Sequence, residues 1–82
     1  MEVKISFYGN LINLAGGRSH TLRVEGRPPT VADLRAAVAR AFPEVAPHLE
    51  HTAVGMGTEL FGDDAVLQAD QEISLLPPVS GG

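Results

Sequence analysis

The sequence has no cysteine, and none of its apolar runs approaches the roughly 18 residues that a membrane-spanning helix needs. The lack of cysteine excludes a disulfide framework, a thiolate nucleophile and a cysteine metal site, and it fits a reducing compartment. Residues 1–4 also lack the basic start and apolar run of a secretory signal. We therefore expect a cytoplasmic protein that does not interact with a membrane.

Basic residues are few as well. Six lysines and arginines stand against ten aspartates and glutamates, which gives a net charge of −4, and the basic residues are spread along the chain. Proteins that bind nucleic acid concentrate such residues in a patch. We therefore expect no nucleic-acid partner, and an acidic surface instead favours a basic protein partner.

The residues that are present indicate one small folded domain. The chain has 82 residues, which is enough for a single domain, and 44% of them are apolar. Val3, Ile5 and Phe7 alternate with polar residues, which predicts a strand with one buried face. A second strand follows around Leu22 and Val24, after a loop that contains a short apolar helical turn. We expect these two strands to pair as a hairpin.

A helix is predicted over Val31–Ala41. Thr30 precedes it and Asp33 follows three residues later, a close variant of the capping box that starts many helices. Apolar residues then recur at helical spacing and define one buried face. They are Val31, Leu34, Val38 and Phe42, and Arg35 is expected to point away from this face.

A weak third strand is predicted over His51–Met56, and the last strand contains Ile73 and Leu75 facing inward. A helix between two hairpins usually packs across one face of a mixed sheet. We therefore predict an α+β fold, a β-grasp roll in which the first and last strands are parallel neighbours. The predicted domain covers residues 1–76, and a C-terminal tail, residues 77–82, protrudes from it.

No side chains in the predicted domain form a convincing catalytic or metal site. His48 and His51 lie three residues apart but lack further ligands, so we predict no metal. Asp63, Asp64 and Asp70 fall in turns, where aspartate is common for conformational reasons. We therefore predict that the chain is not an enzyme by itself.

The tail, Pro77-Pro78-Val79-Ser80-Gly81-Gly82, is the most unusual segment. Two prolines stiffen its start because each fixes φ. Two glycines then leave no side chain near the Gly82 carboxylate, so this group can enter a narrow tunnel. Six extended residues reach up to about 20 Å. A flexible terminus of linker composition is the alternative, but Gly82 is the best candidate for the reactive group.

Three segments carry a resemblance to a known family. They are the opening Val3-Lys4-Ile5-Ser6-Phe7, the helix entry Thr30-Val31-Ala32-Asp33-Leu34, and the end Leu75-Leu76-Pro77-Pro78-Val79-Ser80-Gly81-Gly82. The sequence resembles the ubiquitin-like sulfur carriers, and within them most of all the small subunits of molybdopterin synthase. It differs before the last strand, where Ala69-Asp70-Gln71-Glu72 replaces the usual Asp-Gly-Asp-Glu.

The resemblance implies a mechanism in which partners supply the catalytic groups. An E1-like adenylyltransferase would use ATP and Mg²⁺ to adenylate Gly82, and a sulfur donor of the cysteine desulfurase or rhodanese type would convert it to a thiocarboxylate. The tail would then enter the large subunit of molybdopterin synthase and pass sulfur to cyclic pyranopterin monophosphate. The resemblance implies no cofactor bound by this chain itself.

The predicted site residues follow from the tail and from the strand that leads to it. Gly82 is the reacting residue, and we predict that Gly81, Ser80, Val79, Pro78, Pro77, Leu76 and Phe61 contact partners. Phe61 and Leu76 are included because alternation leaves them outside the core. Other sulfur pathways, to cysteine, thiamin or thionucleosides, remain alternatives. So does a protein modifier, for which Lys4 is the only side chain that could extend a polymer.

Overall fold

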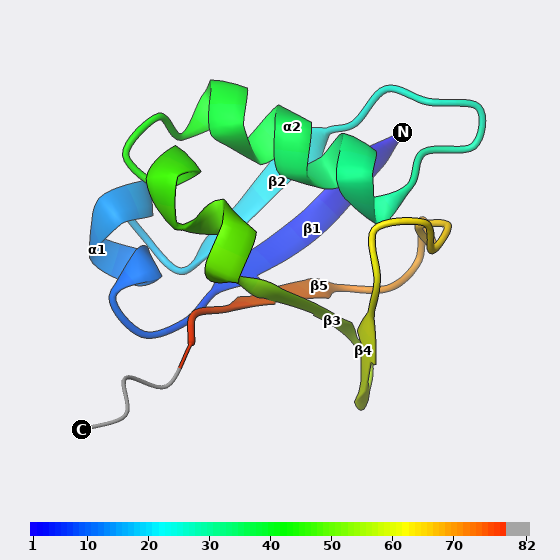
Figure 1. Cartoon of the computed structure of the whole chain (residues 1–82). Helices are drawn as coiled ribbons and strands as arrows, with labels where there is room; N and C mark the ends of the chain where they lie inside the picture. The colour runs from blue at the N-terminus through cyan, green and yellow to red at the C-terminus, as the bar shows by residue number, and fades with distance from the viewer. Residues whose placement is uncertain (79–82) are drawn as a thin grey trace.

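The computed structural model describes residues 1–78, and Val79, Ser80, Gly81 and Gly82 lie outside the described residues. Its strands are β1 (Glu2–Phe7), β2 (Ser19–Arg23), β3 (Ala53–Met56), β4 (Glu59–Phe61) and β5 (Ile73–Leu76). Its helices are α1 (Leu11–Ala15), α2 (Val31–Ala41) and a 3₁₀ helix, η1 (Ala46–His51). Figure 1 shows all three helices on the same side of the sheet.

The five strands form one mixed sheet in the order β2-β1-β5-β3-β4. β1 pairs with β2 as an antiparallel hairpin and with β5 in parallel, and β5 also pairs antiparallel with β3. The last strand is therefore the central one, as the sequence predicted. The chain after Leu76 consequently starts from the middle of the sheet and not from an edge.

The helix α2 begins and ends as predicted, and its start is fixed by the predicted capping box. The Asp33 backbone N–H donates to Thr30 Oγ1, and the Thr30 backbone N–H donates to Asp33 Oδ2 at 2.8 Å. These two bonds satisfy groups that helix starts otherwise leave unpaired. They set the point at which α2 begins to cross the sheet.

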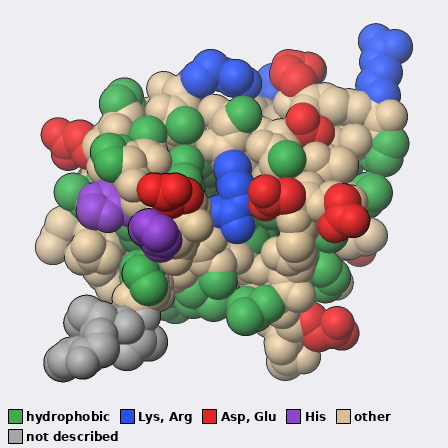
Figure 2. Space-filling model, in the orientation of Figure 1, with side chains coloured by type: hydrophobic (Ala, Val, Ile, Leu, Met, Phe, Trp, Pro, Cys, Tyr) green, Lys and Arg blue, Asp and Glu red, His purple; other side chains and the backbone are tan. Residues whose placement is uncertain are grey.

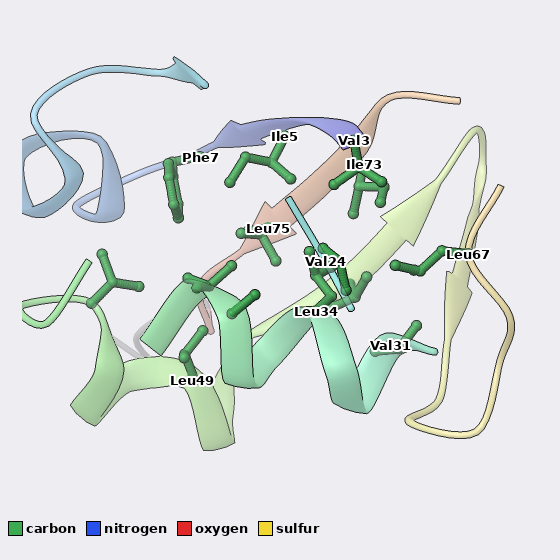
Figure 3. Packing of buried hydrophobic residues seen from close by; sticks show 14 of the residues in the cluster. Val3, Ile5, Phe7, Val24, Val31, Leu34, Leu49, Leu67, Ile73 and Leu75 are labelled. Carbon is green, nitrogen blue, oxygen red and sulfur yellow. The ribbon is translucent and has the colours of Figure 1, made fainter. Parts of the chain in front are cut away.

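The core lies between α2 and the inner face of the sheet (Figure 3). Val3, Ile5 and Phe7 from β1 and Ile73 and Leu75 from β5 are at most 1% exposed. Side chains of α2, of η1 and of the loop before β5 cover them from the other side, among them Val31, Leu34, Val38, Leu49 and Leu67. Leu22 is only partly buried because it lies on the edge strand β2.

Two elements differ from the predictions. Residues 46–51 form a 3₁₀ helix, so β3 starts at Ala53 and not at His51 as predicted. β4 was not among the predicted strands, yet it pairs with β3 and makes the sheet five-stranded. Three residues are too few to show a period of two, so the sequence carries no local signal for this strand. It forms because the edge of β3 is available for pairing.

No helix in the described part of the chain is long and apolar enough to cross a membrane. On the face shown in Figure 2, acidic and basic side chains are interspersed and no basic patch stands out.

Candidate functional site

The described helices lie on one side of the sheet and leave its outer face uncovered (Figure 1). Strand register aligns five residues across this face in one row, which consists of Ser19, Ser6, Ser74, Gly55 and Leu60. Four of the five are serine or glycine, so the middle of the outer face is shallow.

The half of this face over β1 and β2 is polar. Ser6 is only 3% exposed because the Glu72 side chain covers it, and Ser6 Oγ donates a 2.7 Å hydrogen bond to Glu72 Oε2. Lys4 and Thr21 lie beside Glu72, around a hollow of about 240 Å³. This bond between β1 and the loop before β5 orders the loop that leads into the central strand.

Apart from Ser74, the half over β3, β4 and β5 is apolar. Leu60 is 66% exposed, the highest value among the large hydrophobic residues described. A Cβ at Gly55 would lie 3.5 Å from Leu60 Cδ2 and 3.8 Å from Leu76 Cδ1, so the two leucines approach each other over the glycine. Leu76 in turn pairs with Ala53. We call Ala53, Gly55, Leu60 and Leu76 the apolar patch.

This patch corrects one of the sequence predictions. Phe61 was expected outside the core, but its partner in β3 is the buried Val54, and Phe61 packs against the core from the inner face. Leu60, the neighbouring residue, is the one that projects outward. Alternation could not locate these two side chains, because β4 was not predicted as a strand and its register was therefore unknown. Leu76 is half-buried and belongs to the outer face, as predicted.

The start of the tail lies at one end of this patch. Pro77 is half-buried and Pro78 is exposed, and together with Asn10, His48 and His51 they border a hollow of about 220 Å³. The two histidines are three residues apart in η1, and residues at this spacing eclipse in a 3₁₀ helix. The remaining predicted tail residues, 79–82, lie outside the described residues.

The third histidine has a structural environment. His20 is half-buried between the rings of Phe7 and Phe42, at centroid distances of 5.7 and 4.8 Å, in edge-on arrangements. Its Nε2 lies 3.1 Å from the Gly17 carbonyl oxygen. Asp63 is also in structural use, because it accepts a 2.8 Å hydrogen bond from Arg35 Nε. Within residues 1–78, no three histidine or acidic side chains come together as a metal site.

Comparison with known proteins gives a family match over nearly the whole chain. Residues 5–82 match the ThiS family. No curated protein matches the sequence.

Solved structures are similar in fold. SAMP1 from Haloferax volcanii is 27% identical with a TM-score of 0.85, and the match covers 100% of both chains. A candidate molybdopterin converting factor subunit 1 from Pyrococcus furiosus is 15% identical, with a TM-score of 0.84 and coverage of 96% of this chain and 99% of that one.

A third similar structure comes from a complex. It contains subunits 1 and 2 of the molybdopterin-converting factor from Helicobacter pylori, and the match has 24% identity, a TM-score of 0.68 and full coverage of both chains. The likenesses show that the chain has the β-grasp fold of ubiquitin-like proteins.

Proposed function

Because the chain belongs to the ThiS family, we propose that it is a sulfur carrier that receives sulfur at the carboxylate of Gly82. The observation that carries the proposal is a match that extends through the Gly-Gly end, on a domain whose central strand leads into that end. A central strand is held by hydrogen bonds on both sides. It is therefore a firm base for an arm that must carry a reactive group into another protein.

The proposed chemistry has two stages. An E1-like partner binds ATP and Mg²⁺, and a carboxylate oxygen of Gly82 attacks the α-phosphorus, so that pyrophosphate leaves. The terminal sulfur of a persulfide on a donor protein then attacks the acyl carbon and AMP leaves. A thiol cleaves the resulting sulfur–sulfur bond, which releases the thiocarboxylate and leaves the donor as a disulfide. This chain supplies the acyl group, the docking surface and the reach, and the partners hold the nucleotide.

Intact-mass spectrometry tests the proposal directly. The chain ending at Gly82 is incubated with an E1-like adenylyltransferase, ATP, Mg²⁺ and a persulfide donor. We expect a product heavier by the difference between sulfur and oxygen, located at the C-terminus by fragmentation. A chain that keeps its original mass with every such enzyme from its own cell extract would refute the carrier function.

We further propose that the sulfur goes to molybdopterin, with the large subunit of molybdopterin synthase as the receiving partner in the cytoplasm. The structural likeness to a subunit of a molybdopterin-converting complex supports this pathway. The alternatives are carriers for cysteine, thiamin or thionucleoside synthesis. Affinity purification distinguishes them, because a molybdopterin-synthase large subunit bound to this chain is expected only for the first.

The second candidate function is single attachment to other proteins. The likeness to small archaeal modifier protein 1 from Haloferax volcanii favours it. Lys4 is the only lysine, so side-chain-linked polymers could have only one linkage. Isopeptide remnants ending in Gly-Gly on lysines of other proteins, lost when this chain is deleted from the cell, would support the modifier. If these remnants are absent while the thiocarboxylate is present, only the carrier function is supported.

Replacing Leu60 with glutamate should weaken docking. Leu60 is exposed on the apolar patch, so a charge there opposes burial against a partner but costs the free chain little. We expect Leu60→Glu to lower the affinity for the large subunit roughly tenfold or more, measured by titration calorimetry. Val66→Glu is the matched control, because Val66 is 44% exposed but lies beside the start of α2 in a bridge with Thr30. Equal affinities of the two variants would exclude the patch as the docking site.

A further inference from the structure

The first residue of the tail is seated against a glycine of another element. Gly9 lies in the turn between β1 and α1, with φ of +59°, and a Cβ at this position would lie 2.9 Å from Pro77 Cγ and 3.8 Å from Pro77 Cδ. Two carbon atoms at 2.9 Å overlap, so the present position of Pro77 requires that residue 9 has no side chain. In Figure 1 this turn runs beside the end of β5.

Pro77 cannot avoid such an overlap as a flexible side chain would. Its ring closes onto its own backbone nitrogen and fixes φ, so moving the ring means moving the backbone at the start of the tail. Space for such a movement exists, because Pro77 and Pro78 border the hollow of about 220 Å³. A side chain at residue 9 would therefore change the direction of the arm without unfolding the domain.

The glycine side of this contact is rigid. The Tyr8 backbone N–H donates to the Leu75 carbonyl at 3.2 Å, which ties the turn to β5 two residues before Pro77. The carbonyls of Tyr8 and Gly9 accept hydrogen bonds from Leu11 and Ile12 in α1, each at 3.2 Å. Leu11 is fully buried in the core, so the turn is anchored on both sides.

We propose that Gly9 is a positioning residue for the reaction at the C-terminus: it seats Pro77 against the start of α1 and so sets the direction in which the arm leaves β5. The inference rests on the proposed carrier function, because its consequence is felt at the reacting carboxylate. A displacement of about 1 Å in a reacting group can cost up to a hundredfold in rate. An arm directed wrongly at its first residue carries that error to its tip.

Two glycines with the same backbone demand allow a matched test. Gly57 has φ of +65°, and a Cβ there would meet nothing within 4 Å. Asparagine tolerates positive φ better than most residues, so Gly9→Asn and Gly57→Asn should keep similar melting temperatures. We expect kcat/KM for thiocarboxylate formation to fall about tenfold in Gly9→Asn relative to Gly57→Asn. The assay uses the E1-like enzyme, ATP and persulfide donor that convert the wild-type chain. Equal values would overturn the proposal.

Removing the proline ring provides the rescue. In a Pro77→Ala background the overlapping Cγ is gone, so Gly9→Asn and Gly57→Asn should react at equal rates. A tenfold difference that persists in this background would contradict the proposed contact between Gly9 and Pro77. Pro77→Ala alone should lose more activity than Pro78→Ala, because the second substitution leaves the contact between Gly9 and the Pro77 ring intact. Equal losses in these two variants count against the proposal even if Gly9→Asn does not fold.

A measurement without any enzyme tests the contact between Gly9 and Pro77 independently of the proposed carrier function. In the NMR spectrum of the full chain, the Gly9 α-protons should show nuclear Overhauser contacts to the Pro77 ring. The absence of these Overhauser contacts would refute the proposed contact between Gly9 and Pro77, whatever the function of the chain. If the Overhauser contacts are present but no adenylating enzyme converts the wild-type chain, the proposed function is refuted, and the contact between Gly9 and Pro77 is a structural feature only.

Discussion

Deletion of Gly82 is expected to abolish thiocarboxylate formation and to leave the melting temperature unchanged. Glycine has no side chain to bury, so the deletion removes no apolar side chain, and the described core residues extend from Val3 to Leu75. The deletion shortens the arm by one residue, about 3.3–3.6 Å when extended. A carboxylate withdrawn by that distance from the adenylating centre loses nearly all of its reactivity. Intact-mass spectrometry after incubation with the enzyme, ATP and donor measures the loss, and calorimetry measures the melting temperature.

Ser80→Ala is the matched control for this deletion. It removes one polar side chain from the same tail but keeps the arm length and both terminal glycines. We expect it to lose far less activity than the deletion, because it removes one predicted partner contact but leaves the reacting carboxylate at its full reach. A deletion variant that still gains sulfur would show that Gly82 is not the acceptor. A loss of several degrees in melting temperature would mean that the tail belongs to the folded domain.

Replacement of Arg35 by methionine is expected to destabilise the fold by about 2–4 kcal/mol. The Arg35 side chain is 22% exposed, and its Nη1 donates to the Leu49 and Thr52 carbonyl oxygens while Nε donates to Asp63. These bonds join α2 to the end of η1 and to the loop before β3. Methionine keeps the apolar stem but leaves two carbonyls of buried residues without this donor, and each such loss costs about 1–3 kcal/mol. Urea unfolding measures the change.

Two controls separate the stability that the Arg35 hydrogen bonds contribute from the effect of removing a positive charge. Arg40 lies in the last turn of the same helix and is exposed, so Arg40→Met should cost less than about 1 kcal/mol. Arg35→Lys keeps the charge but not the planar fork that reaches several acceptors, so it should lose more than half of the stability that Arg35→Met loses. A loss at Arg35 no larger than that at Arg40 would mean that the bonds to the carbonyls add no net stability.

Local signals in the sequence were sufficient for the elements with strong patterns. The alternation of Val3, Ile5 and Phe7 identified β1, and the Thr30–Asp33 box identified the start of α2, because both signals depend only on neighbouring residues. The parallel pairing of the first and last strands followed from chain connectivity, since the helix between two hairpins returns the chain to the centre of the sheet. The family likewise followed from short motifs at the two ends of the domain and at the helix entry.

Contacts between distant residues could not be read in this way. Arg35 was expected only to point away from the apolar face of its helix, because nothing in that helix reveals that two carbonyls from residues 49 and 52 lie within reach. The outward projection of Leu60 and the inward projection of Phe61 depend on the register of β4 against β3. The contact between Gly9 and Pro77 joins positions 68 residues apart.

The tail illustrates this division most clearly. The sequence by itself determined its composition: two prolines that stiffen it, two glycines without side chains, and the Gly82 carboxylate as the best candidate for the reacting group. Only the tertiary structure decided how its base is held, by two strands that flank β5 and by a turn that meets Pro77. The reason is physical. Composition limits the conformations of a segment through its own φ and ψ angles, whereas its direction is set by packing against residues that only folding brings together.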